Sequence, residues 1–246
     1  MAYSVEWKSI LDEVDDFSRE NYGIVWYRGI TYSDHKLDSG LFRLKISDSV
    51  QDYINLEEQM YRYFKSLGHL LSSNEEGWKL LYSMQHHGVR TRLLDWTESF
   101  AVGLFFATSN WTRGKAAVWM LNPLQLNLVS GGKEEIIAPS KVDYWDRFTN
   151  IDQKTIAIYP IKNNTRIAAQ HGVFTVQGNT LLSLEDEFKE SLISQRALKK
   201  IELSIDVRED ALNFLRQNGI NNFSLFPDLD GLAKYINDIH INPSWL

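Results

Sequence analysis

The sequence predicts an α+β fold in a single domain. Helical patterns and short β-rich runs are segregated along the chain more than they alternate, which is typical of this class rather than of a doubly wound sheet. The 246 residues are 43% hydrophobic and 24% charged, ordinary values for a globular domain. No repeat, low-complexity tract or linker divides the chain, so we expect one domain over residues 1–246.

The first expected elements are a helix and a strand. Apolar residues recur at helical spacing among acidic ones over residues 4–19, which predicts an amphipathic helix ahead of a core spanning about residues 23–246. The run GIVWYRGI at 23–30 places β-branched and aromatic residues between glycines and predicts a buried strand. Arg28 and Gly29 lie at the end of this strand.

Two helices are expected after a turn-rich, irregular connection at residues 31–49. Apolar residues recur at helical spacing over Tyr53–Leu67 and again over Asn74–His86. Asn74 is the expected N-cap of the second helix, and Gly88 is the residue expected to stop it.

The later elements follow from the same signals. VRTRLLDW at 89–96 predicts a strand or extended linker, and Thr97 or Ser99 is the expected cap of a helix at Phe100–Ser109. The polar stretch Gly131–Asp152 is expected to form a flexible loop at the surface. The remaining predictions are the strands KAAVWMLN, closed by Pro123, TIAIYP, GVFTVQG and LKKIELSI, and the helices Val207–Asn218 and Leu229–Ile236.

Composition and charge exclude several classes of protein. The net charge of -6 supplies no global positive field, so binding to a nucleic-acid backbone would need a local basic patch. The absence of cysteine excludes disulfides and thiolate metal sites. The acidic N-terminus is unlike a secretory signal, and the longest apolar run is far shorter than the ~20 residues of a membrane-spanning helix. We therefore expect a soluble, cytoplasmic protein with no membrane partner.

The segment QHHGVRTRLLDWT at 85–97 concentrates polar and charged residues. His86 and His87 lie at the expected end of a helix, where adjacent side chains point about 100° apart and cannot readily share one metal ion. No spacing in the chain demands a metal, so no metal site is expected. Arg92 and Asp95 are close enough along one extended segment to predict an ion pair that braces it.

The common phosphate-binding and nucleophile motifs are absent. The sequence contains no P-loop, no GxGxxG fingerprint and no GxSxG elbow. Arg28 remains the candidate anion ligand, because a guanidinium offers a fork of donors matched to phosphate or carboxylate. Gly29 beside it allows a backbone or a ligand to approach closely.

The chain resembles the FRG-domain family of bacterial and phage-related proteins. The aromatic-Arg-Gly motif of that family appears here as Tyr27-Arg28-Gly29. The resemblance continues through LDSGLFR at 37–43, QHHGVRTRLLDWT at 85–97, RIAAQHGVFT at 166–175 and FPDLDGL, and covers nearly the whole chain.

The sequence also has a more distant similarity to ADP-ribosyltransferases. This similarity implies that the domain has a split β-sheet core flanked by helices. Arg28 matches the arginine that holds the NAD pyrophosphate or ribose, and Thr97 with Ser99 matches the Ser/Thr element before a helix. Gln170 stands where those enzymes carry a catalytic glutamate. Glutamine can hydrogen-bond a ribose hydroxyl but cannot supply the negative charge that stabilises an oxocarbenium-like transition state.

NAD is the ligand that this similarity implies. Arg28 would contact phosphate, Thr97 and Gln170 would contact ribose, and Tyr27, Trp96 or Phe174 would form the wall for nicotinamide. His86 or His87 would serve as an acid or base near neutral pH, or bind a ribose hydroxyl.

Three functions are expected, the first of them implied by the similarity to ADP-ribosyltransferases. The first is an ADP-ribosyltransferase that transfers ADP-ribose from NAD to a macromolecule as a toxin or phage-defence effector, with an antitoxin or regulatory protein as a further partner. The second, favoured by Gln170, is a non-catalytic module that binds a nucleotide or protein. The third is hydrolysis of a nucleic-acid or other phosphoester bond by His86, His87 and Asp95.

Overall fold

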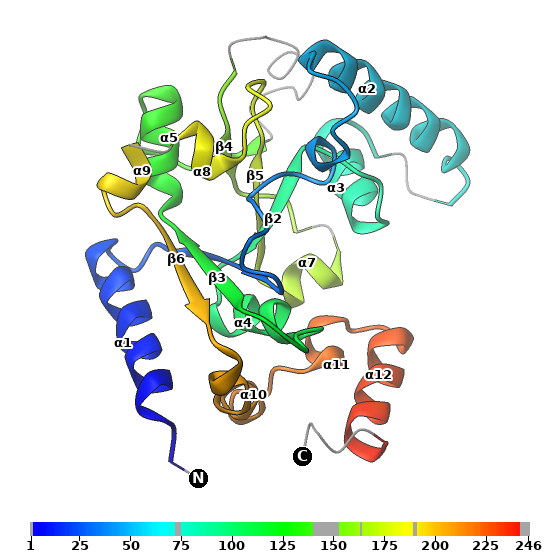
Figure 1. Cartoon of the computed structure of the whole chain (residues 1–246). Coiled ribbons are helices and arrows are strands. Elements are labelled where there is room, and N and C mark those ends of the chain that lie inside the picture. The colour runs from blue at the N-terminus through cyan, green and yellow to red at the C-terminus, as the bar shows by residue number, and fades with distance from the viewer. Residues whose placement is uncertain (1, 72–74, 140–152, 163, 189–190, 242–246) are drawn as a thin grey trace.

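The computed structural model describes residues 2–71, 75–139, 153–162, 164–188 and 191–241 (Figure 1). Its helices and strands are, in order, α1 Val5–Glu20, β1 Trp26–Ile30, η1 Phe42–Leu44, α2 Val50–Leu67, α3 Gly77–His86, β2 Leu93–Thr97, α4 Phe100–Thr108, β3 Ala116–Leu121, α5 Pro123–Gly131, β4 Ile156–Ile158, α7 Thr165–Ala169, β5 Gly172–Val176, α8 Leu184–Glu187, α9 Ser191–Ser194, β6 Leu198–Leu203, η3 Ile205–Val207, α10 Arg208–Gln217, α11 Asn222–Leu225 and α12 Leu229–His240. The expected segregation along the chain is wrong, because helices and strands alternate from β1 to β6. The entirely antiparallel sheet nevertheless confirms the predicted α+β class over a doubly wound parallel sheet.

The strands form one six-stranded sheet in the order β4-β5-β2-β1-β3-β6, with every neighbouring pair antiparallel. The strand pairing is shortest at the centre of this sheet, between β1 and β2. β1 meets β2 at the single register pair Tyr27–Thr97, whereas β1 is in register with β3 from Trp26 to Ile30. The sheet is therefore divided into a β4-β5-β2 half and a β1-β3-β6 half, while the likeness of this core to that of ADP-ribosyltransferases stays a prediction.

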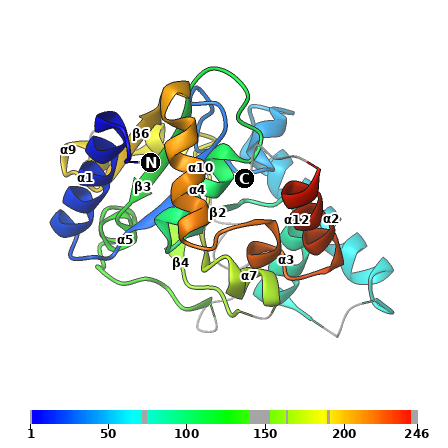
Figure 2. The ribbon, with the colours of Figure 1, turned by 90° about the horizontal axis from the view of Figure 1, so that it is seen from below.

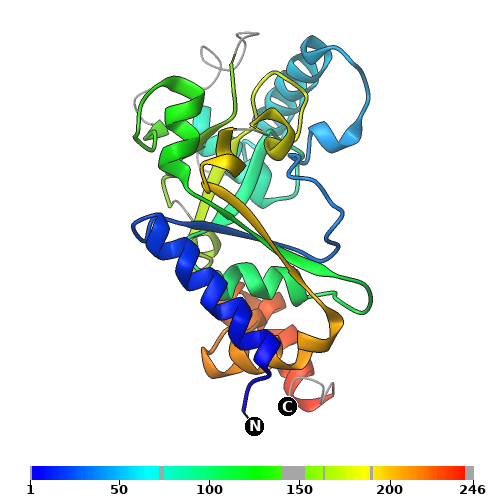
Figure 3. The ribbon, with the colours of Figure 1, turned by 60° about the vertical axis from the view of Figure 1, so that its left-hand side comes forward.

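Helices cover the two halves separately on one face of the sheet. Residues directly opposite each other in register share a face, so Tyr27 and Thr97 point to the same side. Over the β1-β3-β6 half, α1, α4 and α10 form one apolar cluster, and Figure 2 shows α10 lying across α4. Over the other half, α2, α3 and α7 form a second cluster. Figures 1 and 3 place α1 and α2 on opposite sides of the molecule.

The opposite face of the sheet has one continuous core. Apolar residues from all six strands pack there against α5, α8 and α9. The sheet is thus supported across its whole width on this side, while the helices on the other side leave a division above the split.

Most predicted elements are present, with small changes at their ends. The helix predicted at Tyr53–Leu67 begins three residues earlier, and the next begins at Gly77 with Glu76 at its N-cap position. Asn74, the predicted cap, lies outside the described residues. Ser99 rather than Thr97 caps α4, because its hydroxyl accepts from the amide of Val102 at 3.4 Å.

Several helices of the structure were not predicted from the sequence. Pro123 was expected to close a strand, but it also opens α5, with the Asn122 side chain capping the first turn. The other missed helices, α7, α8, α9 and α11, have four or five residues each, too few to show a helical period. Residues 140–152 of the predicted surface loop lie outside the described ranges.

The predicted ion pair between Arg92 and Asp95 is wrong. The Arg92 Nε atom donates instead to Glu57 on α2 at 2.8 Å, and neither side chain is exposed. Asp95 accepts a hydrogen bond from Gln85. Residues three apart in an extended chain point to opposite faces, so the two side chains diverge.

Within the described ranges, no helix has the length and apolar character needed to cross a bilayer.

Candidate functional site

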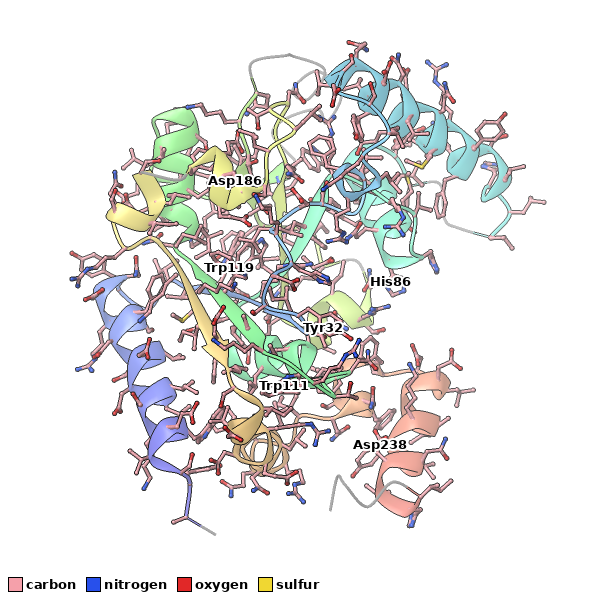
Figure 4. All side chains as sticks on the ribbon, in the orientation of Figure 1. Tyr32, His86, Trp111, Trp119, Asp186 and Asp238 are labelled. Atoms are coloured by element: carbon pink, nitrogen blue, oxygen red, sulfur yellow. The ribbon has the colours of Figure 1, made fainter. Side chains whose placement is uncertain are left out.

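A pocket of about 310 Å³ lies where the two halves of the sheet diverge. Its walls come from β1, β2 and β5, from α3 and α4, and from α7 with the residues after it. They comprise Tyr27, Arg28, Gly29, Thr31, Tyr82, Gln85, His86, Asp95, Trp96, Thr97, Phe106, Arg166, Ile167, Gln170, Gly172 and Phe174. Figure 4 shows the position of His86 at the end of α3, next to α7.

The pocket brings together most of the residues that the sequence singled out. The members of the predicted site that line it are Tyr27, Arg28, Gly29, His86, Trp96, Thr97, Gln170 and Phe174. His87 and Ser99 are not among its lining residues. His87 is exposed and its ring stacks against Phe64 of α2 at 6.4 Å, while Ser99 caps α4.

Arg28 spans the split in the sheet. Its Nη1 atom donates to the main-chain oxygen of Asp95 at 2.5 Å, and its Nε atom is buried with no hydrogen-bond partner among the described residues. Burial lowers the pKa of Arg28 to about 10, an effect that Asp95 opposes and Arg43 reinforces. The guanidinium is therefore still charged at neutral pH, and one of its donors is not satisfied by any described residue.

Gly29 allows α4 to lie directly on β1. A Cβ atom built at this position would lie 1.9 Å from the oxygen of Gly103 and 2.4 Å from the nitrogen of Ala107. The close approach predicted for Gly29 is thus made by a helix backbone, and it fixes α4 as a wall of the pocket.

Thr97 and Gln170 tie the pocket walls together. The Thr97 hydroxyl donates to the main-chain oxygen of Gln170 at 2.7 Å and accepts from the amide of Ser99 at 3.1 Å. The Gln170 side chain donates through Nε2 to the oxygen of Leu225 at 3.1 Å. These contacts join β2 to α7 and α7 to α11, and contact between these side chains and a ribose stays a prediction.

An aromatic pair forms one wall of the pocket. The rings of Tyr82 and Phe174 stack with centroids 5.3 Å apart and planes 10° apart. Tyr82 is fully buried, its hydroxyl has no hydrogen-bond partner within the described part of the chain, and burial raises its pKa. The sequence reading missed Tyr82 as a site residue because it lies within the apolar pattern of α3.

The pocket is locally basic although the chain is acidic. Arg28, Arg166 and His86 lie in its walls, and Asp95 is the single carboxylate among the described lining residues. The pKa of His86 is lowered, first by burial and then by Arg166 and His87, against a smaller opposing effect of Asp228. The lowered pKa favours the neutral form of His86, so the positive charge of the pocket comes mainly from the two arginines.

The sequence reading also gave no pocket role to Gln85 and Arg166, and it expected Asp95 to be structural. Gln85 and Asp95 lie within the motif QHHGVRTRLLDWT and Arg166 opens RIAAQHGVFT, so the signal was present in the sequence. In the parts of the chain that the structure describes, no three His, Asp or Glu side chains gather as metal ligands.

The family model of the FRG domain matches residues 23–116. This confirms the resemblance to the FRG domain over the segment that runs from before β1 to the first residue of β3. The match includes Arg28, His86, Asp95 and Thr97, but it ends before α7 and β5. No curated protein and no solved structure matches the chain.

Proposed function

We propose that the pocket binds NAD and that the protein transfers ADP-ribose from NAD to a macromolecule. The observation that carries this proposal is the Arg28 guanidinium, which is held across the split sheet and whose buried Nε atom has no hydrogen-bond partner in the described parts of the chain. An unsatisfied buried donor costs about 1–3 kcal/mol, so an anionic ligand that accepts from it gains affinity.

The other walls suit the remaining parts of NAD. Arg166 adds a second cation for a pyrophosphate, and the stacked Tyr82 and Phe174 rings offer a flat surface beside the pocket. Small-molecule sites usually have volumes of about 300–1,000 Å³. The observed 310 Å³ lies near the lower end of this range, which suits one half of a dinucleotide better than the whole molecule.

A non-catalytic nucleotide-binding module is the second candidate. Gln170 is neutral and its amide nitrogen is engaged by Leu225, so this position supplies no negative charge to a transition state. Hydrolysis by His86, His87 and Asp95 has no comparable support, because His87 lies outside the pocket.

Titration calorimetry with NAD tests the proposal. We expect the wild-type protein to bind NAD and Arg28→Gln to bind it at least about 10-fold more weakly, because one charge-assisted contact is lost. Arg113→Gln, at an exposed arginine in the turn before β3, is the matched charge control. Wild-type protein that neither binds NAD nor transfers label from it to a bacterial lysate would refute the proposal.

Expression in a bacterial host tests the biological role. A toxin or phage-defence effector should slow growth in a manner that depends on Arg28, and mass spectrometry of protein and nucleic acid should reveal the acceptor of ADP-ribose. Equal growth with wild-type and Arg28→Gln protein would argue for the binding module. An antitoxin or regulatory partner would then be sought as a protein that restores growth.

A further inference from the structure

Asp95 occupies a position in the pocket that its expected structural role does not explain. Its side chain is exposed on β2, directly opposite Phe174 of β5, and both residues line the pocket. We propose that the Asp95 carboxylate is the negatively charged catalytic residue of the site, a role that rests on the proposed transfer of ADP-ribose.

A short chain of hydrogen bonds orients this carboxylate. The Thr91 hydroxyl donates to Gln85 Oε1 at 2.8 Å, and Gln85 Nε2 donates to Asp95 Oδ2 at 3.0 Å. Because Thr91 supplies the donor to Oε1, the amide of Gln85 must present its NH2 group to Asp95. The Asp95 carboxylate is thereby held in place as the acceptor of this hydrogen bond.

Arg28 makes its hydrogen bond to the backbone of Asp95, although the two side-chain charges also attract each other. The guanidinium contacts the main-chain oxygen of Asp95 at 2.5 Å rather than the carboxylate. One residue of β2 therefore has its backbone fixed by Arg28 and its side chain fixed by Gln85 from α3. The oxygen Oδ1 is left for a ligand or substrate.

The charge that Gln170, at the end of α7, cannot supply is therefore available from β2. Asp95 is the sole carboxylate among the described residues that line the pocket, and a fixed negative charge stabilises positive charge that develops beside it. It lies in the same pocket as the cations Arg28 and Arg166, which suit the phosphates of the substrate.

In the proposed transfer of ADP-ribose, Asp95 acts as the general base. The bond between ribose C1′ and the nicotinamide nitrogen breaks, and its electron pair leaves with nicotinamide as a neutral base. Positive charge on C1′ and the ring oxygen is stabilised by the carboxylate. An oxygen or nitrogen of the acceptor bonds to C1′ and gives its proton to Asp95, which releases it to water.

The variant Asp95→Asn tests this role, because asparagine keeps an oxygen for Gln85 and removes the charge. We expect its affinity for NAD to stay within about threefold of wild type and its rates of nicotinamide release and of label transfer from NAD to lysate to fall about 100-fold or more. Asp12→Asn, at an exposed residue of α1, is the matched control.

The outcomes separate this role from the proposed function. Wild-type protein that does not bind NAD overturns both, and wild-type protein that binds NAD without releasing nicotinamide overturns the role of Asp95 and favours the binding module. An active wild type with an equally active Asp95→Asn variant overturns the role of Asp95 alone. A parallel loss of affinity and turnover in that variant makes Asp95 a binding residue and also overturns its catalytic role.

A second variant keeps the test valid if Asp95→Asn does not fold. Gln85→Ala removes the donor that orients the carboxylate and leaves its charge in place. We expect kcat for nicotinamide release to fall about 10-fold with KM for NAD unchanged, as for loss of an interaction made in the transition state. An unchanged kcat in this variant would contradict the role of Asp95.

Discussion

Glu57 of α2 and Arg92 form an ion pair in which neither side chain is exposed. The carboxylate accepts from Arg92 Nε at 2.8 Å and from the Arg92 main-chain amide at 3.1 Å. Arg92 Nη1 also donates to Asn179 Oδ1 at 2.7 Å. The pair therefore fastens α2 to the residue that precedes β2, one of the two strands that meet at the split.

Loss of this ion pair should strongly lower the free energy of unfolding. In Glu57→Gln the Arg92 charge stays buried without its counter-charge, so we expect the free energy of unfolding to fall by about 3–5 kcal/mol. Urea denaturation followed by circular dichroism measures this change. The neighbouring change Glu58→Gln, which removes an exposed pair with Arg62, should cost about 1 kcal/mol or less. Equal effects of the two changes would contradict the buried role of Glu57.

The contact between β1 and α4 depends on Gly29. In Gly29→Ala the new methyl group meets the oxygen of Gly103 and must push α4 away from the strand. We expect destabilisation of about 1–3 kcal/mol or more in thermal or urea unfolding. Gly131→Ala is the control, since a Cβ there meets nothing within 4 Å and lies in the last turn of α5, where alanine should stabilise by about 0.5–1 kcal/mol. A neutral Gly29→Ala would show that α4 does not rest on β1.

The buried hydroxyl of Tyr82 has no hydrogen-bond partner among the residues that the structure describes, which predicts different effects on stability and on binding. Tyr82→Phe should leave the free protein as stable as before, or more stable by up to about 1 kcal/mol, because it removes a buried polar group that makes no hydrogen bond to the described residues. It should weaken ligand binding if the hydroxyl meets the ligand. Tyr53→Phe should instead cost about 1 kcal/mol, because the Tyr53 hydroxyl accepts from the amide of Ile46 at 2.9 Å. Differential scanning calorimetry distinguishes the two variants, and a marked loss of stability in Tyr82→Phe would show that its hydroxyl is paired.

His86 should make stability depend on pH. Burial and Arg166 lower its pKa in the folded protein, with Asp228 opposing. Below about pH 6.5 the unfolded chain therefore binds a proton at this residue more readily than the folded chain, so acidification destabilises the fold. Melting temperatures measured between about pH 5 and pH 8 should fall less on acidification in His86→Gln than in wild type. His69→Gln, at an exposed histidine after α2, is the control, and identical pH profiles for wild type and His86→Gln would contradict the expectation.

Local patterns located much of the site as well as the fold. Each strand of the described sheet overlaps a β-rich run of the sequence, with β2 ending one residue beyond its run, and Arg28 was identified from its place at the end of such a run. Eight of the ten predicted site residues line one pocket. The wrong ion pair has a physical cause: Arg92 was paired with the nearest carboxylate along the chain, whereas its partner Glu57 is 35 residues away.

By itself, the sequence determined the α+β class, the positions of the strands and longer helices, and the resemblance to the FRG domain. These depend on residue periods and motifs that are local to each segment. Only the tertiary structure decided that β1 and β2 meet at one register pair, that Tyr82, Asp95 and Arg166 enter the pocket with Arg28, and that Glu57 neutralises Arg92. These depend on contacts between segments far apart in the chain, which no local pattern records.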